Sequence, residues 1–109
     1  MQTEKWYGAS GHGWVFTVAA LPFQHDQPGR NGNFVFCRRS GEAWQAVLIG
    51  EGDLARAIAA GQADTCVKAK GATHVHWRFT GGGEAMRREI DGDLKAGHPS
   101  CRPPSGCSA

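Results

Sequence analysis

Four stretches of the chain have the apolar run or the two-residue alternation that is typical of β-strands. They are rich in aromatic and β-branched side chains and cover residues 14–20, 33–38, 44–49 and 74–79. The second and third stretches lie on either side of Arg39-Ser40-Gly41-Glu42, a turn sequence that predicts a β-hairpin. In the last stretch the alternation places Val75, Trp77 and Phe79 on one side and His74, His76 and Arg78 on the other.

Three further stretches have apolar residues at helical spacing. The first follows Asp53, whose side chain can cap a helix that Gly61 ends in a left-handed conformation. The others cover residues 63–70 and 84–96. The order strand, strand, strand, helix, helix, strand, helix predicts an α+β fold resembling an α/β sandwich. We expect a small mixed, mainly antiparallel sheet of three to four strands, flanked by about three helices.

The two ends of the chain differ from this domain in composition. Residues 1–13 are polar and glycine-rich and predict a loose lead-in to a domain over residues 14–102. Residues 103–109 carry too few apolar side chains to order themselves and predict a flexible tail.

Composition sets mild limits on function. The 109 residues suit one domain, and a formal charge of +2 argues against a strongly electrostatic, sequence-blind nucleic-acid binder. No apolar run is long enough to cross a bilayer, and the start lacks the regions of a signal peptide, so we expect a cytoplasmic protein with no membrane contact. The four cysteines contain no CxxC pair, and the default in that compartment is free thiols.

Two tripeptides in the predicted hairpin carry a family resemblance. They are Gly32-Asn33-Phe34 and Leu48-Ile49-Gly50, and Gly50-Glu51-Gly52-Asp53-Leu54 and, further on, Asp93-Leu94 accompany them. In order and spacing these segments resemble the GIY-YIG nuclease superfamily, over nearly the whole chain. The resemblance implies the predicted layout, with one extra N-terminal strand.

The resemblance also implies a site for phosphodiester hydrolysis, but the residues at its positions have changed. Phe34 and Leu48 stand where the family has its two tyrosines, so neither position offers a phenol for proton transfer. The position of the family arginine falls on Ala57, so Arg56 is one residue away from that position. The metal-binding glutamate falls on Asp91, which can ligate Mg²⁺ or Mn²⁺ or instead pair with Arg87 on the helix surface.

Basic and histidine side chains supply other candidates. A cationic surface for nucleic acid would use Arg38, Arg39, Arg78 and Arg87, with His74 and His76 on the same strand face as Arg78. The two histidines are either structural or face the cleft, and with Cys66 and Cys101 they offer suitable zinc ligands.

Three functions remain open from the sequence. The preferred one is a GIY-YIG-like domain that has lost hydrolysis and binds DNA, another nucleic acid or a protein partner. The second is a metal-dependent endonuclease with a rebuilt site, in which His25 or His76 acts as base, Arg56 or Arg78 holds the phosphate, and Asp91 holds Mg²⁺ or Mn²⁺. The third is a small soluble domain of unrelated role. No cofactor is certain.

Overall fold

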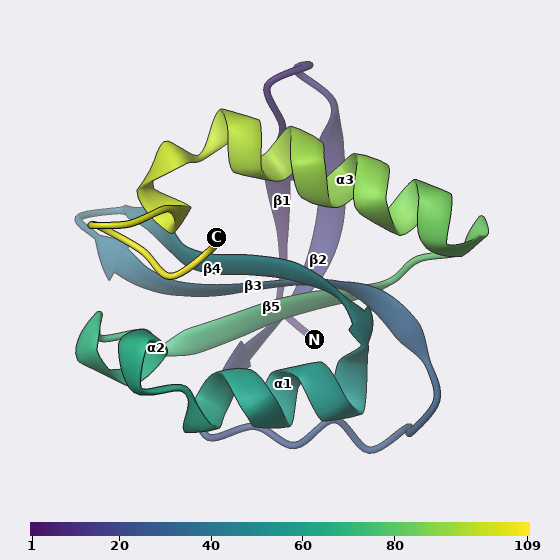
Figure 1. The fold of residues 1–109 in the computed structure, drawn as a ribbon, viewed down its shortest axis with the longest axis horizontal. Coiled ribbons are helices and arrows are strands. Elements are labelled where there is room, and N and C mark those ends of the chain that lie inside the picture. The colour runs from purple at the N-terminus through teal and green to yellow at the C-terminus, as the bar shows by residue number, and fades with distance from the viewer.

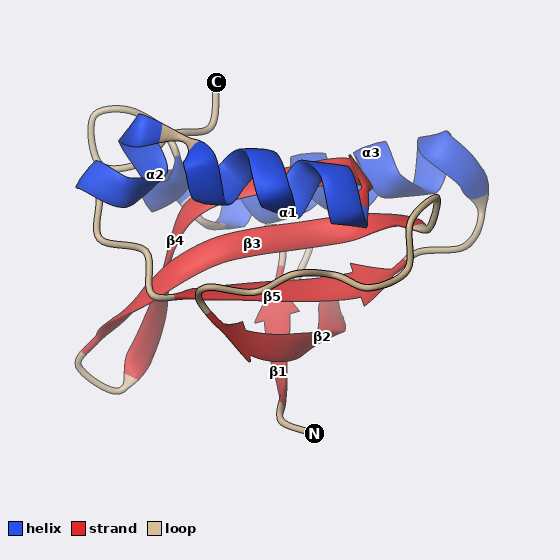
Figure 2. Ribbon diagram, turned by 90° about the horizontal axis from the view of Figure 1, so that it is seen from below, coloured by secondary structure: helices blue, strands red, loops and turns tan.

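The sheet has five strands, all paired antiparallel. The computed structural model describes residues 1–109, and the strands are β1 (Thr3–Tyr7), β2 (Gly13–Ala20), β3 (Asn31–Ser40), β4 (Ala43–Asp53) and β5 (His74–Phe79). Their order across the sheet is β1-β2-β5-β3-β4, which runs from one edge to the other in Figure 2. The predicted α+β class and the β3–β4 hairpin are confirmed. The sheet has one strand more than the predicted maximum of four.

The additional strand comes from the segment that we expected to be a loose lead-in. β1 pairs with β2 from Thr3 opposite Thr17 to Tyr7 opposite Gly13. Trp6 is 4% exposed, so a single large ring anchors this short polar strand in the core. That anchor explains why a polar composition does not make the segment loose.

Helices cover both faces of the sheet. α1 (Leu54–Ala63) and α2 (Thr65–Ala69) lie on one face, and α3 (Gly83–Gly97) lies on the other, followed by a short 3₁₀ turn at Pro99–Cys101 (Figure 1). Alternate residues of β3 therefore enter two separate cores. Val35 packs with Ile90 and Leu94 of α3, while Phe34 and Phe36 pack with Leu54 and Ile58 of α1, among other residues.

The first helix begins as predicted but ends later. Asp53 caps α1, and its side chain accepts a hydrogen bond from the backbone N–H of Arg56. Gly61 does not end the helix in a left-handed conformation, because α1 continues to Ala63. Its lack of a side chain serves packing instead, since a Cβ at Gly61 would overlap the ring of Phe36.

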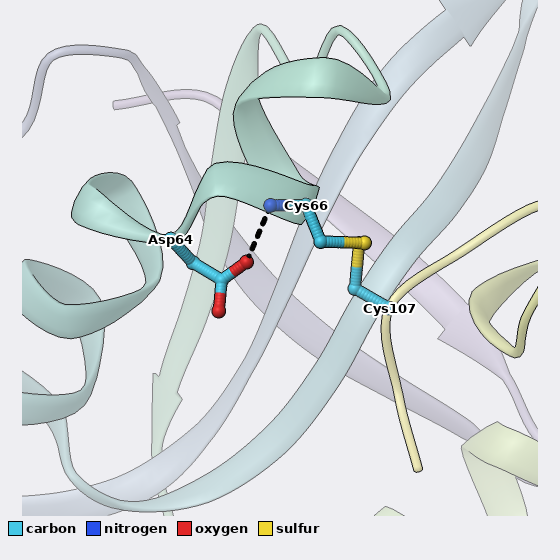
Figure 3. A group of neighbouring side chains, drawn as sticks. All are labelled: Asp64, Cys66 and Cys107. Atoms are coloured by element: carbon cyan, nitrogen blue, oxygen red, sulfur yellow. Dashed lines mark hydrogen bonds between the residues drawn. A yellow bond between two sulfur atoms is a disulfide. The ribbon is translucent and has the colours of Figure 1, made fainter.

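The C-terminal segment is fixed to the domain, contrary to the predicted flexible tail. A disulfide joins Cys66 of α2 to Cys107, as Figure 3 shows, so the expectation of free thiols is wrong for this pair. Cys37 and Cys101 are free and buried. The backbone N–H of Cys107 donates to the carbonyl of Val47 at 2.8 Å, and Ser108 is 2% exposed. The disulfide and the contacts with β4 thus hold the segment in place, although it has few apolar side chains.

Candidate functional site

Phe34 and Leu48, the two predicted motif positions, lie in the core beneath α1. Phe34 is 6% exposed and packs edge-to-face against Phe36, with ring centroids 5.8 Å apart. Its ring covers Gly50, where any Cβ would overlap it. Leu48 is half-buried in the same cluster. These side chains supply packing, as expected from apolar strand residues, and offer no group for proton transfer.

The other two candidate catalytic residues lie in different layers. Arg56 is exposed on α1, whereas Asp91 is on α3, beyond the opposite face of the sheet (Figure 1). Asp91 forms an ion pair with Lys95, with Oδ2 and Nζ 2.9 Å apart, instead of pairing with Arg87. The structure therefore does not bring Arg56 and Asp91 together. The predicted catalytic set is dispersed, with a packed sheet between its two charged members.

A polar row crosses three strands on the α3 face. Asn33 of β3 lies opposite Glu51 of β4 on one side and Arg78 of β5 on the other. Asn33 is fully buried; its amide donates to the carbonyl of Arg87 at 2.9 Å, and its carbonyl accepts from the hydroxyl of Thr80 at 2.7 Å. The Nε of Arg87 is 3.0 Å from a Glu51 oxygen. These bonds connect the end of β5 to α3.

Arg78 is the one member of this row without a partner. Its side chain makes no hydrogen bond or ion pair, and its Nε is shielded from solvent. Burial lowers the pKa of its guanidinium, which nevertheless stays protonated at neutral pH. Its Nε has lost hydration without a hydrogen bond to replace it, while the residue as a whole stays partly exposed. An anionic ligand would provide that replacement.

Arg78 lies in a cleft that forms where β2 and β5 separate. β2 pairs with β5 from Ala20 to Thr17, and from Thr17 to Gly13 it pairs with β1. The β1–β2 ribbon therefore turns steeply away from the other strands, as Figure 1 shows. The resulting cavity has a volume of about 860 Å³. We call it the wedge cleft, and its walls include Trp14, Val15, Arg78, Thr80, Met86 and Ile90.

A second hollow adjoins the wedge cleft and adds positive charge. It has a volume of about 400 Å³, is lined by Arg30 and Arg87, and shares Phe79, Thr80 and Gly81 with the wedge cleft. The guanidinium of Arg30 stacks on the ring of Phe79, 4.0 Å from its centroid. Arg30, Arg78 and Arg87 thus surround the end of β5, and we call them the arginine end. Two carboxylates offset part of this charge, since Glu51 pairs with Arg87 and Asp53 accepts a hydrogen bond from Gly29 in the wall of the second hollow.

The basic residues predicted to share one surface are separated in the structure. Two of the predicted binding residues, Arg78 and Arg87, belong to the arginine end. Arg38 and Arg39 lie near the β3–β4 turn, where Arg38 bonds to Gln45 and Arg39 stacks on Trp44. Arg38 is five positions along β3 from Asn33, the neighbour of Arg78, which is a distance of about 17 Å for an extended strand. Arg30 was not among the predicted binding residues, and the only local sign of its position is the turn sequence Gln27-Pro28-Gly29 before it.

His74 and His76 belong to an aromatic cluster near the hairpin turn. His76 is fully buried, and its Nδ1 accepts a hydrogen bond from the Nε1 of Trp6 at 2.9 Å. Burial, followed by the nearby charges of His74 and Arg39, lowers the pKa of His76 from 6.5 to about 4. The rings of His74 and His76 both pack edge-on to Trp44. This arrangement is structural, and it places the two histidines away from the arginine end.

Neither the predicted zinc site nor the alternative bases are assembled. Cys66 of α2 is bonded to Cys107, Cys101 is in the α3-side core, and no group of closely spaced metal ligands contains Cys101 or either histidine. His25, the other candidate base, is 5% exposed and packs against the rings of Trp77 and Phe79. Neither His25 nor His76 lines a cleft together with a carboxylate and an arginine.

Asp64, Cys66 and Cys107 form the one group of potential metal ligands that lie close together. Their ligand atoms are within 4.8 Å of one another (Figure 3). The two sulfurs are bonded to each other, and one carboxylate oxygen of Asp64 accepts hydrogen bonds from the N–H groups of Cys66 and Val67. Helix capping and the disulfide together account for this group without a metal ion.

Comparison with known proteins gives no further guide to the site. No family model matches the chain, and neither the curated proteins nor the solved structures contain a match. None of the helices has the length and apolar character needed to span a membrane.

Proposed function

We propose that this chain is a nucleic-acid-binding module that keeps a GIY-YIG-like hairpin and has lost phosphodiester hydrolysis. The observation that carries the proposal is the unpaired Arg78 at the centre of the arginine end. Phosphate is an anion that a planar guanidinium group binds through two parallel hydrogen bonds, as it binds a carboxylate. Three arginines around one strand end suit a phosphate backbone better than a single isolated anion.

Loss of hydrolysis is supported by the positions of the residues that hydrolysis would need. The reaction requires a proton acceptor, positive charge at the phosphate and a metal ion in one cleft. Phe34 and Leu48 cannot accept a proton, and Asp91 is engaged by Lys95 on the far side of the sheet from Arg56. The arginine end has positive charge, but the carboxylates beside it are engaged, Glu51 by Arg87 and Asp53 by the backbone N–H groups of Gly29 and Arg56.

The proposal is tested by measuring binding and cleavage on the same material. Fluorescence anisotropy with short labelled oligonucleotides should show binding that weakens steeply between about 50 and 200 mM salt. Arg78→Gln should weaken binding about tenfold or more, because a hydrogen bond to a charged group contributes roughly 1.5–3 kcal/mol. The salt slope should fall by about one. Arg102→Gln is the matched control, since it removes the same charge from an exposed residue beyond the far end of α3.

Cleavage is tested by incubating supercoiled DNA with Mg²⁺ or Mn²⁺. We expect the DNA to remain intact. Nicking that disappears in Asp91→Ala would overturn the loss of hydrolysis and favour a rebuilt nuclease. Binding of an acidic peptide without binding of any nucleic acid would replace the proposal with a protein-binding role. Equal effects of Arg78→Gln and Arg102→Gln would remove the arginine end as the binding surface.

A further inference from the structure

Most of the large apolar side chains that the molecule leaves exposed surround the wedge cleft. Four large apolar side chains are exposed: Met1, Tyr7, Val15 and Met86. Three of these four, all except Tyr7, line the wedge cleft. A cluster of exposed apolar side chains around a cavity marks a binding site more often than scattered ones do. The unpaired guanidinium of Arg78 is in the same cavity, so a fitting ligand has a flat apolar part next to an anionic part.

Nucleotides combine these two parts. A base can lie against Trp14 and Met86, because every base has a π-face that stacks on an aromatic ring or packs on a thioether. The adjacent phosphate can reach Arg78, which lines the same cavity. Gly81 lies at the junction of the two hollows, and its missing side chain leaves open space into which the ligand backbone can pass.

A base that is already unpaired can enter such a cleft directly, whereas a paired base must first leave its duplex. Extracting a paired base costs a few kcal/mol, whereas single strands expose their bases already. Duplex binding would depend on phosphate contacts alone, and the formal charge of +2 provides few of them. We infer that the wedge cleft holds one unpaired base of a single-stranded nucleic acid, with the neighbouring phosphate on Arg78. This inference rests on the proposed nucleic-acid-binding function and specifies its substrate.

The test compares a labelled homothymidine strand with a duplex of equal length by fluorescence anisotropy at one salt concentration. The single strand should bind about tenfold more tightly, since stacking one base contributes roughly 1–3 kcal/mol. Trp14→Leu and Met86→Gln should each weaken single-strand binding by severalfold and leave duplex binding unchanged. Trp14→Phe should restore most of the affinity because it keeps a stacking ring. Tyr7→Leu is the matched control, since it removes an exposed aromatic ring outside the cleft.

The variants remain informative if one of them is unstable. Trp14 also packs against the α3-side core, whereas Met86 is 40% exposed, so Met86→Gln changes the cleft with little effect on folding. Equal binding of strand and duplex, both lost in Arg78→Gln, would overturn the base pocket and leave the proposed function intact. Equal weakening of strand and duplex binding by Met86→Gln would also overturn the base pocket alone. Absence of binding to both nucleic acids would overturn the proposed function as well.

Discussion

Acidification is expected to destabilise the protein through His76. The ring is fully buried, and its Nδ1 accepts a hydrogen bond from the Nε1 of Trp6, so a proton on Nδ1 would break that bond and place a charge in the core. Burial and the charges of His74 and Arg39 lower the pKa of His76 from 6.5 to about 4. The unfolded chain therefore binds a proton at higher pH than the folded protein does. The stability that neutral His76 gives is complete above pH 6.5 and is lost as pH falls toward 4.

The magnitude follows from the two pKa values. Between pH 7 and about pH 5, His76 alone should reduce the free energy of unfolding by about 2 kcal/mol, and by about 3 kcal/mol once pH falls below both pKa values. Urea unfolding monitored by tryptophan fluorescence measures this change directly. His76→Gln is the matched variant, because it keeps a polar side chain that does not titrate. It should be less stable at neutral pH but lose about 2 kcal/mol less than the wild type on acidification.

Two results would refute this reasoning. One is a wild-type protein whose stability is the same at both pH values. The other is a His76→Gln variant that loses as much stability as the wild type, which would assign the effect to other titrating groups. Trp6→Phe gives an independent check, because it removes the donor to Nδ1 and should allow His76 to take up a proton at higher pH. Its free energy of unfolding should therefore fall by less between pH 7 and pH 5 than that of the wild type, because the two pKa values then lie closer together.

Three further predictions concern stability. Cys107→Ser should lower the free energy of unfolding by up to about 4 kcal/mol, because the disulfide closes a loop with a sequence separation of 41 residues. Urea unfolding with and without a reductant measures this loss, and the variant should no longer respond to the reductant. Gly50→Ala should cost about 1–3 kcal/mol, since its Cβ would displace the Phe34 ring, whereas Gly92→Ala, with open space around its Cβ, is the tolerated control in the same thermal unfolding assay. Asn33→Ala should lower the free energy of unfolding by about 1–3 kcal/mol, because it leaves the Thr80 hydroxyl without its acceptor. Backbone hydrogen exchange should also increase at the start of α3. Unchanged exchange there would show that Asn33 does not connect β5 to α3.

The sequence predicts those elements whose pattern of apolar and polar residues reflects which of their faces are buried. The β3–β4 hairpin shows two apolar runs because both faces of these strands enter a core, and β5 alternates. Asp53 caps α1 through a bond that depends only on residues three apart. Gly61 misled the prediction because its role depends on Phe36, a residue distant in the sequence, rather than on its own backbone conformation.

The missing elements and the candidate site depend on contacts between distant residues. β1 is held by one buried ring, Trp6, and the C-terminal segment by the bond from Cys107 to Cys66, and neither interaction produces a periodic pattern. The wedge cleft exists because β2 changes partner at Thr17, and no local sequence signal marks that change. Arg78 was identified as a candidate by its residue type, but only the structure shows that it is unpaired.

The C-terminal segment protects one border of the sheet. β4 is an outermost strand, and the backbone N–H of Ile49 donates to the hydroxyl of Ser108, while the carbonyl of Val47 accepts from Cys107. These groups would otherwise be available to a strand from another molecule, the route by which sheets merge into aggregates. The cross-link to Cys66 keeps this cover in place. Chemical reduction should therefore convert a monodisperse protein into one that self-associates through β4.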